Sequence, residues 1–163
     1  SDVYKRQVEA KKRSEALGYV GQITHVNTQP ITDLLEKGYI PVVSSVGCDE
    51  EGNVYNINAD TMAAQISGAM GAECLISMTD VPGIMLDPAD QASLVHVADI
   101  NDATDLFRQG VIKGGMIPKV ESCIEALLCG VHKVFILDGR VPHSILLEML
   151  TDEGSGTMMV GEK

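Results

Sequence analysis

Residues 60–83, with the sequence DTMAAQISGAMGAECLISMTDVPG, contain the order of elements that decides the fold. Residues 60–70 have the composition of a helix, and Gly71 is a typical helix terminator because glycine readily adopts left-handed backbone conformations. Residues 73–78 form a short apolar run that predicts a buried strand, and the turn residues of Asp80-Val81-Pro82-Gly83 end it. The stretch therefore predicts a helix, a buried strand and a polar loop at the carboxyl end of that strand.

The same alternation of helices and strands continues on both sides of this stretch. Upstream, the sequence predicts a helix over residues 31–38 that stops at Gly38, and a buried strand over residues 39–45. Because strands separated by helices require crossover connections, the pattern favours an α/β fold with a mainly parallel sheet covered on both faces. Downstream, we expect helices over residues 101–109, 119–128 and 143–150, a strand over residues 132–137, and an edge strand over residues 157–160.

The charge balance disfavours two classes of partner. The chain of 163 residues carries 12 lysines and arginines against 23 aspartates and glutamates, a formal net charge of -11. A surface this acidic repels nucleic acid and anionic membranes, so we expect neither as a partner. Five of the cations lie within the first 13 residues. Such a short basic run is typical of solvated surface, although it could also serve as an interaction arm.

Apolar runs and cysteine spacing place the chain among soluble, reduced proteins. No run approaches the roughly 20 apolar residues of a transmembrane helix, and no signal-peptide pattern follows the basic residues, so we expect a cytoplasmic protein. Cys48, Cys74, Cys123 and Cys129 form no Cys-x-x-Cys pair, and the segments around the last three have core composition, which favours buried free thiols. The four histidines are equally scattered, so no metal site is expected.

Two segments carry candidate chemistry. Asn56, Asn58 and Asp60 recur at every second residue before the helix of residues 60–70, a period that places them on one side of extended backbone. Lys119 follows two glycines in GGMIPK, an approach to a helix at which backbone N–H groups can hold phosphate. Amides, a carboxylate and a lysine suit phosphoryl transfer, and ligands of open α/β sheets bind beyond the carboxyl ends of the strands.

Each candidate residue also has a purely structural interpretation. Asp60 could cap the helix that it begins, and Asn56 and Asn58 could satisfy loop backbone. The loop of residues 80–83 could be only a turn, Met116 only a core residue, and Lys119 only a solvated residue of a first helical turn. Alone, each structural interpretation is favoured, whereas the ordered combination favours a functional site.

Four motifs together resemble the acetylglutamate kinases of the amino acid kinase family, from about Leu17 to the C-terminus. They are YNINAD at residues 55–60, TDVPGI at residues 79–84, GGMIPKVE at residues 114–121 and GSGTM at residues 154–158. The resemblance implies a three-layer α/β/α sandwich, ATP with Mg²⁺ as phosphoryl donor, and N-acetyl-L-glutamate as acceptor in arginine biosynthesis.

The resemblance also implies roles position by position. Asn56 would hold the acetylglutamate, with Asn58 in the same substrate-binding motif. Asp60 would orient the active-site lysines, and Lys119 would stabilise the transferring phosphoryl group. The nucleotide would be held by two loops, the first with Asp80, Val81, Pro82, Gly83, Ile84 and Met85 and the second with Val111, Ile112, Lys113 and Met116.

In the C-terminal region, the resemblance implies that the activity is regulated. His143, Glu148, Gly154 and Gly156 match the pattern of arginine-inhibited members, so L-arginine is expected as a feedback inhibitor, and a homo-oligomer is expected at full length. The alternative is that the helix of residues 143–150 contributes an apolar core face and leaves Glu148 solvated.

The family's Lys-x-Gly-Gly phosphate loop, second Gly-Gly loop and acceptor-binding arginine match nothing in this sequence. We therefore expect an incomplete kinase with little activity by itself. Residues 1–16 would be a basic, partly unmatched segment, and residues 17–163 would be the nucleotide-binding portion with part of the acceptor site. Two other functions stay open. One is a different amino acid kinase, which the Asn-x-Asn-x-Asp pattern disfavours, and the other is a non-catalytic nucleotide- or ligand-sensing module of the same fold.

Overall fold

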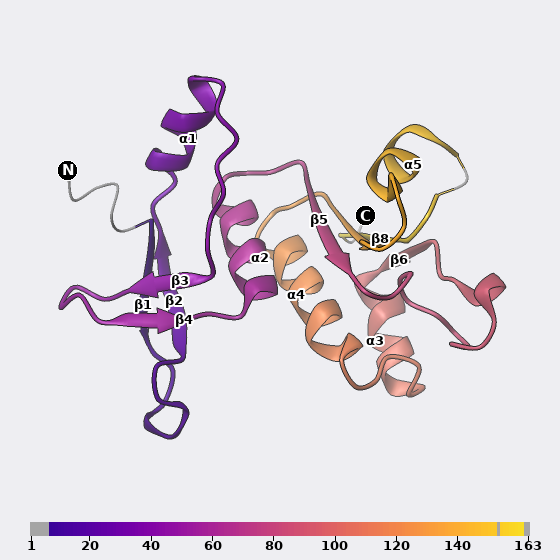
Figure 1. The fold of residues 1–163 in the computed structure, drawn as a ribbon. Coiled ribbons are helices and arrows are strands. Elements are labelled where there is room, and N and C mark those ends of the chain that lie inside the picture. Colours follow the sequence, from indigo (N-terminus) through magenta and orange to yellow (C-terminus); the bar gives the residue numbers. More distant parts are fainter. Residues whose placement is uncertain (1–6, 153, 162–163) are drawn as a thin grey trace. The chain divides into compact units, whose positions relative to one another are not determined.

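The computed structural model describes residues 7–152 and 154–161, and in it the chain forms two units, residues 1–70 and 71–163 (Figure 1). The first unit has a four-stranded sheet in the order β2-β1-β3-β4. β1 (Val8–Lys12) pairs antiparallel with β2 (Gly21–Val26) and parallel with β3 (Val46–Cys48), which pairs antiparallel with β4 (Val54–Asn56). The short 3-10 helix η2 (Glu15–Leu17) connects β1 and β2.

Alternating side chains of this sheet form the core of the first unit. Val8 and Ala10 of β1, Tyr55 of β4 and the following Ile57 are buried together with Met62 of α2 (Ala59–Ala69). Because strand side chains alternate between faces, the residues between them face outward. Lys11, Lys12 and Arg13 are exposed, as expected for solvated basic residues, whereas Lys5 and Arg6 lie outside the described residues.

The helix expected upstream is α1 (Gln29–Glu36), and it ends as the sequence predicts. The N–H of Gly38 donates to the Leu35 carbonyl (2.9 Å) and the N–H of Tyr39 to the Leu34 carbonyl (3.0 Å). Gly38 has a φ of 78°, which is the left-handed conformation that closes a helix.

The second unit has a four-stranded sheet in the order β5-β7-β8-β6. β5 (Cys74–Thr79) pairs parallel with β7 (Lys133–Asp138), and β6 (Val97–Asp99) pairs parallel with β8 (Thr157–Val160). Every residue of β7 after Lys133 is buried, as in a central strand covered on both faces. Three helices accompany the sheet, α3 (Ile100–Arg108), α4 (Met116–Leu128) and α5 (Ser144–Leu150), with the 3-10 helix η3 (Gln91–Ser93) in the loop after β5.

The α/β fold class is confirmed, and the strand directions differ from the expected pattern. Both sheets are mixed. The second stays mainly parallel, because only β7–β8 among its described strand pairs is antiparallel, whereas the first has two antiparallel pairs and one parallel pair. β8 is not an edge strand, because it lies between β7 and β6. The sequence patterns do not predict β6 or the four strands of the first unit. β3, β4 and β6 have only three residues each, and the burial of β1 and β2 depends on residues distant in the sequence.

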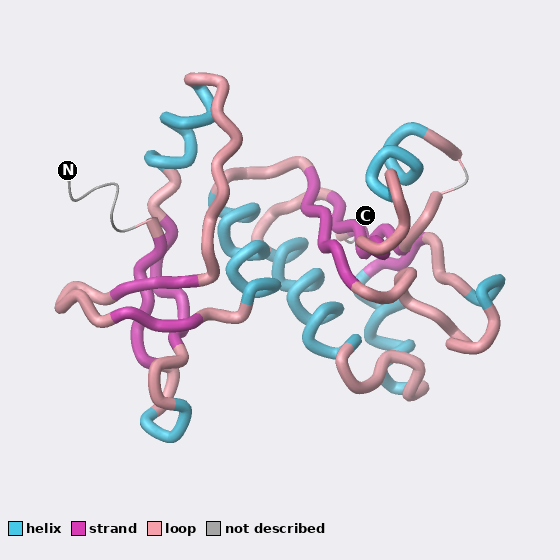
Figure 2. Tube along the Cα trace, viewed as in Figure 1, coloured by secondary structure: helices cyan, strands magenta, loops and turns pink. Residues whose placement is uncertain are grey.

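The buried strand expected over residues 39–45 is wrong. These residues form a loop (Figure 2), and Ile40 and Val42 are 89% and 95% exposed. Pro41 has no N–H, and no strand in residues 7–152 and 154–161 pairs with this segment. Cys129 also departs from expectation, because it is exposed at the end of α4, while Cys123 is buried and all four thiols are free.

No helix in the described part of the chain is both long and apolar enough to cross a membrane.

Candidate functional site

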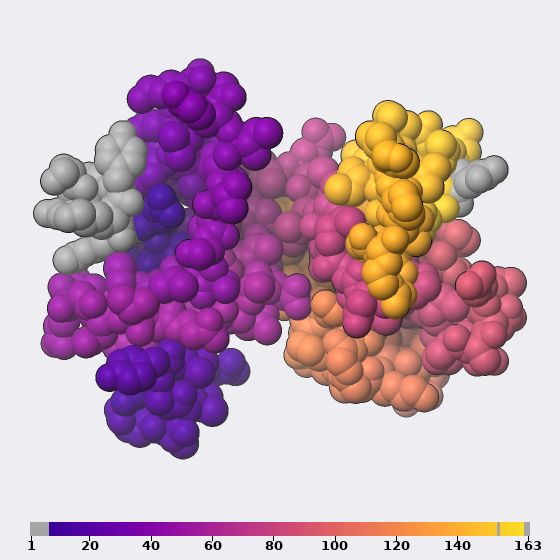
Figure 3. All heavy atoms as spheres, viewed as in Figure 1, coloured from indigo at the N-terminus to yellow at the C-terminus, as the bar shows by residue number. Residues whose placement is uncertain are grey.

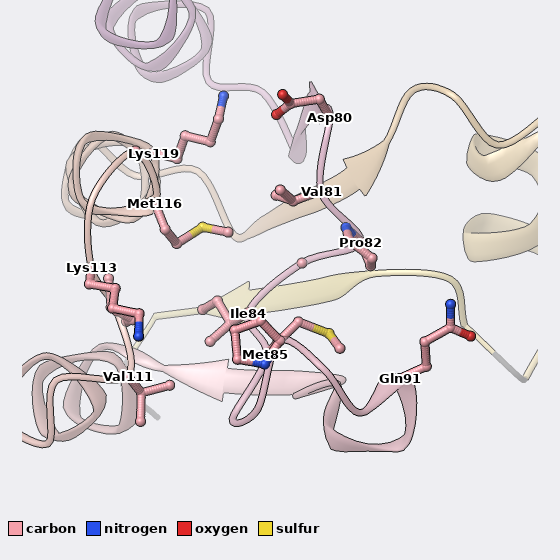
Figure 4. Close-up of a pocket in the computed structure, with 14 residues that line it drawn as sticks. Asp80, Val81, Pro82, Ile84, Met85, Gln91, Val111, Lys113, Met116 and Lys119 are labelled. Atoms are coloured by element: carbon pink, nitrogen blue, oxygen red, sulfur yellow. The ribbon is translucent and has the colours of Figure 1, made fainter.

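A pocket of about 570 Å³ lies in the second unit, at the carboxyl end of β5 (Figure 4). One wall is the loop that follows β5, and the other is the connection from α3 to α4 with the first turn of α4. All ten residues that the sequence assigns to the nucleotide line it, as does Lys119. The lining residues are Asp80, Val81, Pro82, Gly83, Ile84, Met85, Pro88, Gln91, Val111, Ile112, Lys113, Gly115, Met116 and Lys119.

The loop after β5 is held by the core of the unit. The N–H of Ile84 donates to the buried hydroxyl of Thr157 (2.8 Å), and the Ile84 carbonyl accepts from the N–H of Val95 (2.8 Å). Gly83 has a φ of 154°, and a Cβ there would overlap the Thr157 hydroxyl. Only glycine fits this position, so the wall depends on Gly83 and on a residue of β8.

Farther along the same loop, hydrogen bonds of the Ser93 side chain stabilise a turn. The single hydrogen of the Ser93 hydroxyl is shared between the carbonyls of Asp87 (2.7 Å) and Asp90 (2.6 Å), and its oxygen accepts from the N–H of Asp87 (3.0 Å). These bonds fix the turn that brings Pro88 and Gln91 to the pocket. Neither lining residue was predicted, because turn residues such as these give no sign of their neighbours in space.

The second wall follows from how α3 ends and α4 begins. The N–H of Val111 donates to the Leu106 carbonyl (3.0 Å), and Ile112 is buried. α4 begins at Met116, three residues before the expected start at Lys119, and Pro118 is tolerated because the first turn of a helix needs no intrahelical N–H donor. No side chain caps the N-terminus of α4. The N–H of Met116 donates to the Lys113 carbonyl (3.2 Å) and that of Ile117 to the Gly114 carbonyl (3.2 Å), and Pro118 has no N–H. What α4 brings to the pocket is therefore the positive end of its dipole.

Charge and apolar surface are separated within the pocket. Asp80 and Lys119 extend toward each other from the two walls, while Val81 and Met116 project into the space beside them (Figure 4). The second cation of the lining, Lys113, comes from the connection between α3 and α4. The pocket thus offers two cations, a helix N-terminus and an apolar wall in a chain whose net charge is -11.

The acceptor-site candidates lie in the first unit. Asn56, the last residue of β4, and Asn58 are exposed, while Tyr55 and Ile57 are buried, as a period of two requires. The Asn58 side chain accepts from the N–H of Thr61 (3.1 Å) and is the N-cap of α2. The alternative that Asp60 caps this helix is therefore wrong, because Asp60 lies within the first turn.

Two of the C-terminal candidates, Gly154 and Gly156, lie beside the carboxylate of a third, Glu148. Glu148 Oε2 accepts from the N–H groups of Ser155 (2.6 Å) and Gly156 (3.1 Å). A Cβ on Gly154 would lie 3.6 Å from both this carboxylate and His96 Nδ1, and His143 has a left-handed φ of 61°. Glu148 is therefore not simply solvated.

The apolar residues of α5 do not form a core face. Ile145, Leu146, Leu147, Met149 and Leu150 are all exposed, and α5 contributes to the surface in the space-filling view (Figure 3). The alternative that this helix serves only as a core element is therefore wrong.

Comparison with known proteins agrees with this fold. The model of the amino acid kinase family matches residues 2–138. The acetylglutamate kinase of Brachyspira hyodysenteriae is 51% identical over 93% of this chain and 53% of its own length, and that of Clostridium beijerinckii is 55% identical over 88% and 50%. The chain thus spans about half the length of these relatives.

Solved structures give the same result. The N-acetylglutamate synthase of Neisseria gonorrhoeae, crystallised with coenzyme A and L-arginine, superposes with a TM-score of 0.86 at 25% identity, over 96% of this chain and 37% of that one. The isopentenyl phosphate kinase of T. acidophilum has the same fold, with a TM-score of 0.60 at 20% identity over 83% of this chain and 53% of its own. With a family match over most of its length and these structural neighbours, the chain belongs to the amino acid kinase family.

Proposed function

We propose that this chain carries the nucleotide site, and part of the acceptor site, of a cytoplasmic kinase that transfers a phosphoryl group from ATP to the side-chain carboxylate of N-acetyl-L-glutamate, a step of arginine biosynthesis. The observation that carries this proposal is that all ten residues expected to hold the nucleotide line one pocket with Lys119. Identities of 51% and 55% to acetylglutamate kinases support the choice of acceptor.

The pocket suits a nucleotide in size and in chemistry. Its volume of about 570 Å³ lies within the range of roughly 300–1,000 Å³ that is usual for ligand pockets. The apolar side chains of Ile84, Met85, Val111 and Met116 fit a base, and Lys113, Lys119 and the positive end of the α4 dipole fit phosphates. A chain this acidic needs such a local cationic surface to bind an anion.

Magnesium enters with the nucleotide in this proposal. Among the lining residues of the described chain, Asp80 is the only carboxylate. Mg²⁺ in kinases is usually held by one or two carboxylates together with the phosphates of the substrate. One carboxylate at the end of β5 fits an ion that the nucleotide brings.

The chemistry requires charge and position rather than a general base. The acceptor carboxylate is ionised at neutral pH and can attack directly. Lys119, on the first turn of α4, stabilises the negative charge that develops on the transferring group, and the helix dipole adds to this effect. Asn56 holds the acetylglutamate. Asn58 uses Oδ1 for the cap of α2, so its NH₂ group is the part that donates to the acceptor. Asp60 orients the lysines.

Nucleotide binding by this chain is the first test. Calorimetry with magnesium ATP should detect weak binding, and Asp80→Ala should weaken it by about tenfold through loss of the carboxylate. Glu73→Ala is the matched control, because Glu73 is an exposed carboxylate at the opposite end of β5. A folded sample that binds neither ATP nor ADP would remove the basis of the proposal.

Turnover is tested in a complete protein, made by joining this chain to the N-terminal half of a relative. Lys119→Ala should lower kcat by about 10²–10³, because the lysine contact strengthens as charge develops in the transition state. The melting temperature should change little. Lys133→Ala, at the start of β7, is the control, and a Lys119→Ala enzyme with normal turnover would exclude the assigned role.

We also propose that L-arginine inhibits the complete protein, as a homo-oligomer, by binding at His143, Glu148, Gly154 and Gly156. In the described chain, Glu148 Oε2 accepts two backbone hydrogen bonds while Oε1 accepts none, which leaves an oxygen for a guanidinium or an amine. The presence of L-arginine in the crystal of the related synthase supports the choice of ligand. Arginine that leaves turnover unchanged would exclude this regulation.

Two other functions compete with the proposal. Kinases for other acceptors share the fold, among them the isopentenyl phosphate kinase at 20% identity. Their lower identity disfavours them, and acceptor screening of the complete protein separates them from the proposal. A non-catalytic sensor is favoured if the complete protein binds ATP but phosphorylates no acceptor.

A further inference from the structure

Outside the pocket, β7 ends in a buried carboxylate that holds an arginine. Asp138 is 6% exposed, and both of its oxygens face Arg140. Oδ1 accepts from the N–H of Arg140 (2.9 Å) and from Nε (2.9 Å), and Oδ2 accepts from Nη2 (2.8 Å). This two-pronged pairing fixes the plane of the guanidinium, which a single contact would not.

The same turn is tied to the strand end that leads into the pocket. The N–H of Gly139 donates to the carbonyl of Thr79 (2.8 Å), and Thr79 and Asp138 are partners in the parallel register of β5 and β7. Asp80, which directly follows Thr79, lines the pocket. Arg140 is therefore attached to the edge of the sheet at which Asp80 begins the pocket wall.

Charge at this edge requires compensation if an anion is to bind. Adjacent strand ends carry the carboxylates of Asp80 and Asp138, and Asp138, which has no part in the proposed magnesium site, would repel a polyphosphate if its charge were not offset. Hydrogen bonds from Arg140 lower the pKa of Asp138 to about 2, and the field of Asp80 is a smaller cause of the raised pKa of Arg140. The Arg140 guanidinium thus acts on both carboxylates. Within the described chain its Nη1 group makes no hydrogen bond.

We propose that Arg140 is a positioning residue for the polyphosphate end of the nucleotide: paired with Asp138, it offsets the charge of that carboxylate at the edge of the sheet beside the pocket. This inference rests on the proposed nucleotide site. Because the side chain of Arg140 is 67% exposed, its effect is moderate and depends on salt. The apolar end of the pocket, around Met85 and Val111, does not depend on it.

The test compares ligands that differ only in phosphate. Arg140→Gln keeps a long side chain that can still bond to Asp138 but has no charge. Calorimetry at low salt should find ATP bound about three- to tenfold more weakly by this variant than by the wild-type chain, with a smaller loss for ADP and none for adenosine. Arg140→Lys, which keeps the positive charge but cannot make the paired hydrogen bonds to Asp138, should recover part of the lost ATP affinity. Raising the salt to 0.5 M should remove most of the difference.

Lys133→Gln is the matched control, because it removes the same charge at the opposite end of β7, roughly 17 Å from Asp138 at 3.3 Å per residue. Three outcomes would overturn the inference: equal binding of ATP by wild type and Arg140→Gln, equal losses for adenosine and ATP, or an equal loss in Lys133→Gln. In each case the nucleotide site itself would stand. A wild-type chain that binds no nucleotide would instead overturn the proposed function, and the inference with it.

Discussion

The loop after β5 and the segment of residues 39–45 are both irregular and rich in apolar residues, yet one is held by the core and the other is not. Ile84 of the loop is 1% exposed, and its N–H and carbonyl both have partners. Ile40 of the segment is 89% exposed. Apolar composition therefore does not decide burial by itself, because a strand or a layer of side chains must be present to cover the residue.

The largest expected effect is the contrast between the two isoleucines. Ile84→Ala should lower the free energy of unfolding of this chain by about 3 kcal/mol, because it removes fully buried methyl groups and leaves a cavity. Ile40→Ala should change it by less than about 0.5 kcal/mol. Urea titrations of both variants measure the difference. Equal losses would mean that residues 39–45 are packed in solution, and the comparison would fail.

Replacing Gly83, in the loop after β5, should cost more stability than replacing Gly38, which directly precedes residues 39–45. Gly83→Ala should lower the free energy of unfolding by about 2 kcal/mol, since the added Cβ meets the Thr157 hydroxyl and the backbone of β8. Gly38→Ala has open space around its Cβ and carries only the strain of a φ of 78°, so a loss of about 1 kcal/mol is expected. Thermal melts of both variants test this, and a larger loss for Gly38→Ala would reverse the contrast.

The smallest expected effect is the pH dependence of the stability that Asp138 contributes at the end of β7. Arg140 holds the folded-state pKa of Asp138 at about 2, below the ordinary value of 3.8. The stabilisation from this carboxylate is therefore present above about pH 4 and is lost as the pH falls from about 4 toward 2. The difference in unfolding free energy between wild type and Asp138→Asn should shrink over that interval. A constant difference between pH 6 and pH 2.5 would exclude an ionic role for Asp138.

Local patterns in the sequence predicted the helices and the grouping of the pocket residues. Gly38 and Gly71 correctly marked the ends of α1 and α2. The residues of the two loops predicted to share a nucleotide do line one pocket, although nucleotide binding itself stays a prediction. Such features are readable because turn and cap chemistry acts over a few residues.

Features that depend on distant partners were missed. The position of β8 inside its sheet and the pairing of β1 with β3 join residues far apart in the chain, and no local pattern specifies them. The paired hydrogen bonds from Arg140 to Asp138 join residues only two positions apart. They form only because of the turn after β7, which the pattern of side chains in the sequence does not reveal. Asn58 was assigned to a motif, whereas its capping role depends on where α2 begins.

The hydrogen bond from Ile84 to Thr157 joins residues that are 73 positions apart. Closing so long a loop has an entropic cost that must be met before the contact forms, so this wall of the pocket belongs to the late events of folding. A chain still emerging from the ribosome would contain both loops of the pocket before β8 existed to anchor the first of them. Competence to bind a ligand there should consequently appear only after β8 has been synthesised and has paired in the sheet, which makes ligand binding a reporter of the folding of the second unit.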